Sequence, residues 1–370
     1  MSDGGKLDAY GQAGVNYAAI DPGKLMAQRA AKRTAVTLES RGVQELAESR
    51  GESAYVIDLG DRYLATVTEA LGTKNLVADE VRALTGRSHY DAIAKDTVAT
   101  ILNDLCTLGG APLCLTAYWG AGRTDWFEDL ERMRDLTEGW ASASEEARCA
   151  WGGGETQVLV GAIEPTRVVL GGSAVGTIAK DRLLTGSRLQ AGDAILIAAA
   201  SGIHANGLTL ARKIAQDLPQ GYATKVPGDG RGYGEVLLDA TPLYGPLVEA
   251  LQDGGVDLHY AVHVTGHGWR KLMRAEQALR YVVELLPPSP PIFELLSNAA
   301  KIDRVEAYAT FNMGAGFAFF VPPHQVELAR DAARQIGREL LQIGHVEAGP
   351  KEVVLRPLGA TLAGDSLQIR

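Results

Sequence analysis

The chain has 370 residues, of which 46% are hydrophobic and 22% are charged, and its formal net charge is −9. This composition excludes disordered and fibrous proteins, and the length exceeds that at which single cores usually divide, so we expect two domains. The acidic balance gives no support for binding along a nucleic-acid backbone, which requires concentrated Lys and Arg.

The cysteines and the apolar segments indicate the compartment. The three cysteines are Cys106, Cys114 and Cys149. Their spacing matches neither a zinc pair nor a disulfide framework, which favours a reducing environment. Met1–Ala9 lacks the pattern of an export signal, and the longest apolar run, Ala194–Ala200, is too short to cross a bilayer. We therefore expect a cytoplasmic protein without membrane contact.

The first half of the chain alternates between helical and strand-like patterns. Helices are predicted at Pro22–Glu48, His89–Leu108 and Phe127–Arg148. Strands are predicted at Tyr55–Leu59, Tyr63–Val67, Pro112–Trp119, Gln157–Ile163 and Thr166–Ile178. The polar, glycine-punctuated stretch Asp181–Asp193 is the expected boundary of this α/β unit.

The second half alternates in the same way and predicts a second α/β unit. Strands are predicted at Ala194–Ala200 and His259–Val264, and helices at Gly207–Gln216, Pro242–Leu251, Ile292–Ala299 and Val326–Leu341. Asp217–Gly234 and the proline cluster Pro287–Pro291 are expected to be loops. We place the two domains at 1–182 and 183–357, with 358–370 as a tail.

A polar stripe lies on the predicted helix His89–Leu108. Asp96, Thr100 and Asn103 are spaced i, i+4 and i+7, so they share one face, while the other faces are apolar. A polar stripe on a largely buried helix needs partners, because burying an unpaired carboxylate is costly. The stripe therefore either lines a cleft that holds ions or faces water.

Two acidic residues lie beside glycines at strand ends, Glu69 in TEALGTK and Glu155 in WGGGETQ. Magnesium prefers oxygen ligands and typically uses one or two carboxylates together with substrate phosphates. Either residue alone is typical of an exposed turn. Together with Asp96, they form a candidate magnesium set.

The segment SGIHANGLTLARKI follows a predicted buried strand and leads into a helix. Asn206 and the neighbouring amides then lie near a helix N-terminus, which favours anions. His204 in this loop is a candidate phosphate donor or acid–base group, and the alternative is a structural histidine.

Three histidines, His259, His263 and His267, recur every fourth residue. The intervening residues are β-branched, which favours a strand over a zinc-binding helix face. The turn TGHG, Thr265–Gly268, is expected to form either an anion site or an ordinary helix cap. Two glycines in TFNMGAGF, Thr310–Phe317, predict a bulge or a close backbone approach.

The motifs SGxHxNG, HxTGxG and TFNxGxGF follow GTK, NDL and GGET in this order. The ordered set resembles the phosphoribosylformylglycinamidine cyclo-ligases of purine synthesis, from Tyr10 to the strand near Gly344. The resemblance implies a two-domain PurM-like α/β (α+β) fold. Its N-terminal domain would contribute strands to the β-barrel of a homodimer, and its C-terminal domain would contain a mixed sheet.

The resemblance also implies an activity, the ATP-dependent closure of an imidazole ring in a small phosphorylated substrate. Residues on the ATP and magnesium side would be Glu69, Asp96 and Glu155 as metal ligands, with Asn103 and Asp104 in support and Lys74 facing phosphates. Residues on the substrate side would be Asn206 and Gly207 of the HxNG turn, Thr265, Gly266 and Gly268 of the phosphate turn, and His204 and His263 near the reacting centre.

Some positions differ from the family pattern. Glu69 stands where the family usually has Asp, and His267 replaces a glycine of TGGG. A glycine-rich segment that precedes the first strands in the family is replaced by Leu38–Ser53, and the family tends to have a lysine near Gln28. These differences leave two alternatives open, an enzyme of this fold that activates another small acceptor and a catalytically silent homologue.

Overall fold

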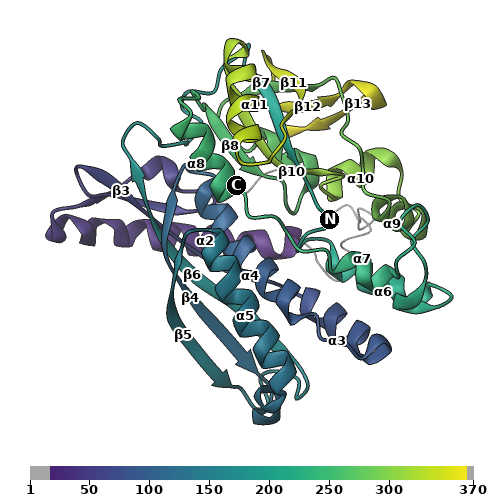
Figure 1. The fold of residues 1–370 in the computed structure, drawn as a ribbon. Coiled ribbons are helices and arrows are strands. Elements are labelled where there is room, and N and C mark those ends of the chain that lie inside the picture. The colour runs from purple at the N-terminus through teal and green to yellow at the C-terminus, as the bar shows by residue number, and fades with distance from the viewer. Residues whose placement is uncertain (1–16, 365–370) are drawn as a thin grey trace, which may run out of the picture.

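The computed structural model describes residues 17–364. The segment Tyr10–Asn16, part of the family resemblance, and the end of the predicted tail, residues 365–370, lie outside them. The chain forms two α/β units (Figure 1), which we call the N-terminal unit, residues 17–179, and the C-terminal unit, residues 194–363. Each unit contains one sheet. The α/β class predicted from the sequence is confirmed.

The sheet of the N-terminal unit has six strands in the order β1-β2-β3-β6-β4-β5. These are β1 (Gln44–Glu45), β2 (Tyr55–Asp58), β3 (Arg62–Ala70), β4 (Ala111–Ala121), β5 (Ala150–Val158) and β6 (Val168–Ala179). Only β4 and β5 pair in parallel. The predicted strand Gln157–Ile163 is wrong, because β5 begins earlier and includes Gly154. A Cβ at Gly154 would lie 2.0 Å from Ala117 O, so the glycine permits this close pairing with β4.

The helices of this unit are α2 (Tyr17–Thr34), α3 (Lys74–Thr85), α4 (Tyr90–Cys106) and α5 (Leu130–Glu146). Helices α4 and α5 cover one face of the sheet (Figure 1). Helix α4 is buried on most sides, as its apolar residues predict. The predicted helix Pro22–Glu48 is wrong beyond Thr34. A 3₁₀ segment, η1 (Ala35–Arg41), follows and ends at Gly42, whose φ of 72° stops the helix before β1.

The sheet of the C-terminal unit has seven strands in the order β13-β12-β9-β11-β7-β10-β8. These are β7 (Ala194–Ala199), β8 (Tyr260–His263), β9 (Leu279–Val283), β10 (Ala315–Val321), β11 (Leu341–Ala348), β12 (Glu352–Leu355) and β13 (Ala360–Ala363). The sheet is mixed, because β9 and β12 pair in parallel. The register shifts between Ala315 and Phe317, which confirms the predicted bulge. Strand β13 extends the sheet beyond residue 357.

Helices of the C-terminal unit cover both faces of its sheet. They are α6 (Leu208–Asp217), α7 (Tyr233–Leu237), α8 (Gly245–Asp253), α9 (Ile292–Ala300), α10 (Arg304–Thr310) and α11 (Val326–Gln335). Helices α8 and α11 pack on one face, and the 3₁₀ helix η5 (Gly268–Met273) lies on the other. The predicted helix Val326–Leu341 is too long, because Gly337 adopts a φ of 70° and Leu341 begins β11.

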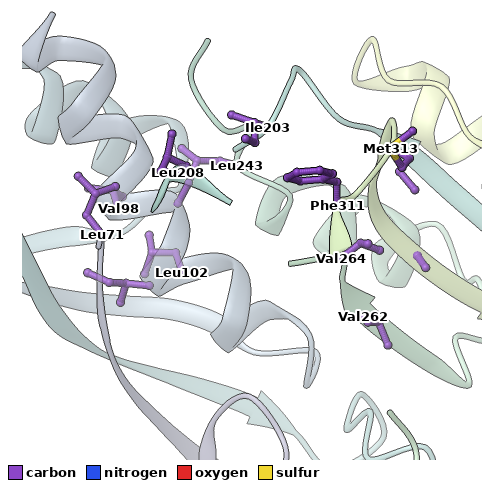
Figure 2. Close-up of a cluster of buried hydrophobic side chains, with 14 of the residues drawn as sticks. Leu71, Val98, Leu102, Ile203, Leu208, Leu243, Val262, Val264, Phe311 and Met313 are labelled. Atoms are coloured by element: carbon purple, nitrogen blue, oxygen red, sulfur yellow. The ribbon is translucent and has the colours of Figure 1, made fainter. Parts of the chain in front are cut away.

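The two units share one apolar core (Figure 2). Leu71, Val98 and Leu102 of the N-terminal unit belong to the same buried cluster as Leu208 and Leu243 of the C-terminal unit. Burial across the junction stabilises one relative position of the units. Between Tyr17 and Gly364, no helix combines the length and the apolar content needed to span a membrane.

Candidate functional site

A cavity of about 530 Å³ lies where the two units meet. Helix α2, the segment before β2, the end of β3 and helix α4 form its N-terminal wall. The polar residues of this wall are Lys24, Gln28, Glu52, Ser53, Glu69, Thr100 and Asp104. The C-terminal wall carries His204, Asn206, Thr241, His263, Thr265, His267, Lys271 and Arg274. Residues distant in sequence therefore meet at one site.

The structure brings together some of the predicted site residues and separates others. Those that line the cavity are Glu69, Asp104, His204, Asn206, His263 and Thr265. Lys74, Asp96 and Asn103 are buried and do not line it. Glu155 is exposed on β5, at the sheet edge, and also lies outside the cavity. Gly207, Gly266 and Gly268 shape the turns beside it without lining it.

Lys74 and Asp96 form a buried ion pair. Lys74 Nζ lies 2.7 Å from Asp96 Oδ2, and neither side chain is exposed. Lys74 also donates to the backbone oxygen of Asp239, at 2.8 Å. Asp96 Oδ1 accepts from the backbone NH of Thr241 at 2.9 Å and from its hydroxyl at 2.5 Å. In this arrangement the atoms predicted to face phosphates and magnesium bind each other and the C-terminal unit.

Asn103, about two turns further along α4, makes a similar connection. Its side-chain nitrogen donates to Pro242 O at 2.9 Å, and its oxygen accepts from Tyr244 N at 2.8 Å. The polar stripe of α4 therefore does not face water, and only Thr100 of its three members lines the cavity. Its partner is the segment 239–244 of the C-terminal unit.

A histidine and an aspartate pair across the cavity. His263 Nδ1 lies 3.3 Å from Asp104 Oδ1, and the side chain of His263 is almost fully buried. Burial raises the pKa of Asp104, but the hydrogen bond and the charges of His263, Arg274 and Lys271 outweigh it and hold the pKa below its usual value. His263 Nε2 has no hydrogen-bond partner within residues 17–364. It is therefore available to a ligand.

His204 is the second buried histidine of the site. Its φ of 59° lies in the left-handed region, and neither ring nitrogen has a hydrogen-bond partner in the described part of the chain. Its ring centre lies 6.2 Å from that of His263 and 6.3 Å from that of Tyr244. Burial, followed by the charges of His263 and Lys74, holds the pKa of His204 well below its usual value. The ring is therefore neutral at pH 7.

Glu69, near the end of β3, faces the same cavity. Burial and the nearby charge of Asp104 raise its pKa to about 7, although the backbone NH of Ala70 partly opposes this shift. Glu69 and Asp104 present oxygen donors of the kind that magnesium uses. Across residues 17–364, however, no three His, Cys, Asp or Glu side chains cluster as a metal site. Glu69, Asp96 and Glu155 thus do not meet as one set.

The turn Thr265–Gly268 precedes a 3₁₀ helix of six residues and not an α-helix. His267 has a φ of 72°. A Cβ at residue 268 would lie 2.4 Å from Tyr308 O, so this position requires the glycine that occupies it. His267 lines the cavity, and burial followed by the charge of Lys271 lowers its pKa to about 4. His259 instead binds Asp193 at 2.8 Å, away from the cavity, which excludes the zinc interpretation of the three histidines.

Several lining residues lie outside the sequence motifs that predicted the site. They are Glu52, Thr241, Lys271 and Arg274. The sequence KLMR, Lys271–Arg274, contained a signal, because residues i and i+3 lie on the same face of a 3₁₀ helix. Tertiary packing alone brings Glu52 and Thr241 to the cavity, so no sequence pattern predicted them.

Comparisons with known proteins extend over both units. Residues 51–178 match the N-terminal domain of AIR synthase related proteins, and residues 190–356 match the C-terminal domain. The phosphoribosylformylglycinamidine cyclo-ligase of Methanobrevibacter smithii is 31% identical over 86% of this chain and 88% of that protein. The enzyme of the same name from Carboxydothermus hydrogenoformans is 32% identical over 94% and 98%.

Solved structures with similar folds have lower sequence identity. The tt0281 protein of Thermus thermophilus has a TM-score of 0.56 and 20% identity, with coverage of 84% of this chain and 90% of that one. The hydrogenase maturation protein HypE in complex with ATP has a TM-score of 0.58, 20% identity and coverage of 81% and 83%. AaThiL complexed with AMPPCP and TMP has a TM-score of 0.57, 12% identity and coverage of 87% and 91%. These likenesses support the two-domain architecture.

Proposed function

Because the chain belongs to the phosphoribosylformylglycinamidine cyclo-ligase family of AIR synthase related proteins, we propose that it closes the imidazole ring of formylglycinamidine ribonucleotide. The product is aminoimidazole ribonucleotide of purine biosynthesis, and the reaction consumes ATP. The observation that carries the proposal is the meeting of Glu69 and Asp104 with His204, His263 and Thr265 at one cavity. These residues come from both units, as a substrate held between two domains requires.

The reaction has two steps, transfer of a phosphoryl group to the formyl oxygen and displacement of phosphate by an internal nitrogen of the substrate. Such chemistry depends mostly on positioning and on neutralisation of charge. We assign the movement of a proton to His263, because Asp104 orients its ring through Nδ1 and leaves Nε2 towards the ligand. The neutral ring of His204 is suited to donate a hydrogen bond to a phosphoryl or formyl oxygen.

Magnesium, when bound with ATP, supplies positive charge against the phosphates. Glu69 and Asp104 fit such an ion, since both are acidic residues that line the cavity and phosphates would supply further ligands. The roles predicted for Lys74 and Asp96 require their ion pair to open when the nucleotide binds. The role predicted for Glu155 requires a nucleotide that reaches β5 or a site completed by a second subunit.

We further propose that the protein is a homodimer assembled through the N-terminal sheet. The face of this sheet opposite α4 and α5 carries Val169 and Val175 of β6, which are 43% and 37% exposed. Leu113 of β4 and Val158 of β5 are also exposed in this sheet. An open apolar sheet face of this kind favours association with a second copy. A cytoplasmic location remains a prediction.

The test is product formation by the purified protein. With formylglycinamidine ribonucleotide, ATP and magnesium chloride, we expect aminoimidazole ribonucleotide by mass spectrometry and ADP in equal amount. Without the substrate, we expect almost no ADP. Absence of product would contradict the proposal. Release of ADP with a different small acceptor would then identify the enzyme as one that activates that acceptor.

A further inference from the structure

The two walls of the cavity differ in charge. The N-terminal wall contains three carboxylates, those of Glu52, Glu69 and Asp104, and one cation, Lys24. Among the described residues that line the C-terminal wall there is no carboxylate, and this wall carries the cations Lys271 and Arg274. A bound molecule with both a metal and an oxyanion would therefore be oriented, with its metal towards the N-terminal unit and its oxyanion towards the C-terminal unit.

The two cations on the C-terminal wall differ in their partners. Arg274 donates to Ser53 Oγ at 2.8 Å and to Gly51 O at 3.0 Å, and its Nε lies 3.6 Å from Glu52 Oε2, so its guanidinium group holds the segment before β2. The ammonium group of Lys271 makes no hydrogen bond or ion pair within residues 17–364, and Glu69 and Asp104 act on it only through their charges. Burial, followed by the charge of Arg274, lowers the pKa of Lys271 to about 8. A poorly solvated cation without a partner is costly, and a bound anion would compensate it.

Neutral donors on the same wall are likewise without hydrogen-bond partners among the described residues. The hydroxyl of Thr265 and the amide of Asn206 line the cavity, and neither side chain makes a hydrogen bond to another described residue. His204 adds ring nitrogens that likewise have no partner there. Polar groups in a cavity wall that lack protein partners are the groups that a polar ligand satisfies.

We propose that Lys271 anchors an oxyanion subsite on the C-terminal wall, which binds a phosphate or phosphoryl group with Thr265 and Asn206 as neutral donors. The identity of the ligand that carries this group rests on the proposed function. Two sources have the required chemistry, the phosphate monoester of the sugar substrate and the phosphates of the nucleotide. Lys271 then determines specificity for a phosphorylated ligand, since its charge would be left unpaired by an uncharged analogue.

Lys271→Gln removes the charge at similar length, and Lys271→Arg retains it. Lys225→Gln is the matched control, because Lys225 is exposed and does not line the cavity. Calorimetric titration of each variant with inorganic phosphate, with ribose 5-phosphate and with a non-hydrolysable ATP analogue measures affinity without turnover. A lost charge-assisted hydrogen bond should weaken binding about tenfold or more in Lys271→Gln. Lys271→Arg should retain most of the affinity.

The three ligands separate the two sources. Weaker binding of ribose 5-phosphate with unchanged binding of the ATP analogue assigns the subsite to the sugar phosphate, and the reverse pattern assigns it to the nucleotide. The proposal is overturned if Lys271→Gln binds all three ligands as tightly as Lys225→Gln does. Because the measurement needs no catalysis, failure to form aminoimidazole ribonucleotide would leave this result unaffected. Thermal unfolding verifies folding. The neutral variant should be at least as stable as the wild type, because burial of the ammonium group outweighs the attraction of Asp104 and Glu69 and no described residue hydrogen-bonds it.

Discussion

Lys74 Nζ and Asp96 Oδ2 lie 2.7 Å apart, and both side chains are fully removed from solvent. The pair joins α3 to α4, and through Asp239 and Thr241 it joins the N-terminal unit to the C-terminal unit. A buried pair of this kind is intolerant of losing one partner, because the remaining charge has no compensation. It therefore sets the relative position of the two cavity walls.

Asp96→Asn should lower the free energy of unfolding by about 3–5 kcal/mol, because it leaves Lys74 as a buried, unpaired cation. Urea denaturation followed by circular dichroism measures the change. The control is Asp253→Asn, which breaks the exposed pair of Asp253 with Arg182 and should cost less than about 1 kcal/mol. Equal effects of the two substitutions would contradict a central role for the buried pair.

The predicted magnesium role of Asp96 can be separated from this structural role. Under conditions where Asp96→Asn remains folded, titration with an ATP analogue at several magnesium concentrations should show a weaker magnesium dependence if Asp96 is a ligand. If Asp96→Asn is less stable but binds the ATP analogue with a normal dependence on magnesium, the role of Asp96 is confined to the interface between the two units.

His263→Gln should lower kcat by roughly 10²- to 10⁴-fold, because the side chain is placed to move a proton in the reaction. His259→Gln provides a matched control. His259 is also buried and also pairs with an aspartate, Asp193, but it lies outside the cavity. We expect the control to lose stability and to retain most of its turnover per folded molecule, as steady-state kinetics would show. Equal losses of kcat would refute the assignment.

His204→Asn keeps the backbone conformation, because asparagine tolerates the left-handed region that His204 occupies at a φ of 59°. We expect an unfolding midpoint close to that of the wild type and a large loss of turnover. A variant with normal kcat and only a higher KM would identify His204 as a residue that positions the substrate.

Strong local patterns predicted much of the fold. Helix α4 and strands β7 and β8 lie within a few residues of their predicted bounds, because a helical apolar pattern specifies α4 and short apolar runs specify the two strands. The predicted bounds of β5 were wrong because glycine is compatible with both a turn and the interior of a strand. The glycines of WGGGETQ were expected at the end of a strand, whereas Gly154 lies inside β5, where it permits close contact with β4.

The candidate site was predicted only in part, for a physical reason. Motif residues such as His204 and His263 sit on turns and strand ends that reach the cavity. The polar residues of α4 gave a correct signal that partners exist, but the spacing on one helix cannot identify the partner. For Asp96 the partners are Lys74 and Thr241, which only the packed structure reveals.

Val169→Lys together with Val175→Lys should convert the proposed dimer to a monomer, because it would place four like charges in the interface. Sedimentation velocity at several concentrations measures the oligomeric state. Leu328→Lys, at an exposed position on α11, is the control and should leave the state unchanged. A wild-type protein that sediments as a monomer throughout would rule out this part of the proposal.

Glu69→Gln should change how stability depends on pH. The folded-state pKa of Glu69 is about 7, above the ordinary value of 4.5, so the folded protein retains a proton that the unfolded chain loses between these values. The free energy of unfolding should therefore fall as pH rises through this window, by up to roughly 3 kcal/mol at pH 7 and above. Glutamine cannot ionise, so the variant should lack this fall.

Urea unfolding of both proteins at intervals from pH 4.5 to pH 8 measures the difference. As pH rises, the free energy of unfolding of the variant should increase relative to that of the wild type. Above pH 7 the difference between the two proteins should stay constant. Adding magnesium with an ATP analogue should reduce that difference if Glu69 binds the metal, because the ion favours the ionised carboxylate of the wild type. If the free energies of unfolding of the wild type and the variant change in parallel with pH in the absence of ligand, Glu69 is less desolvated than its position in the cavity indicates.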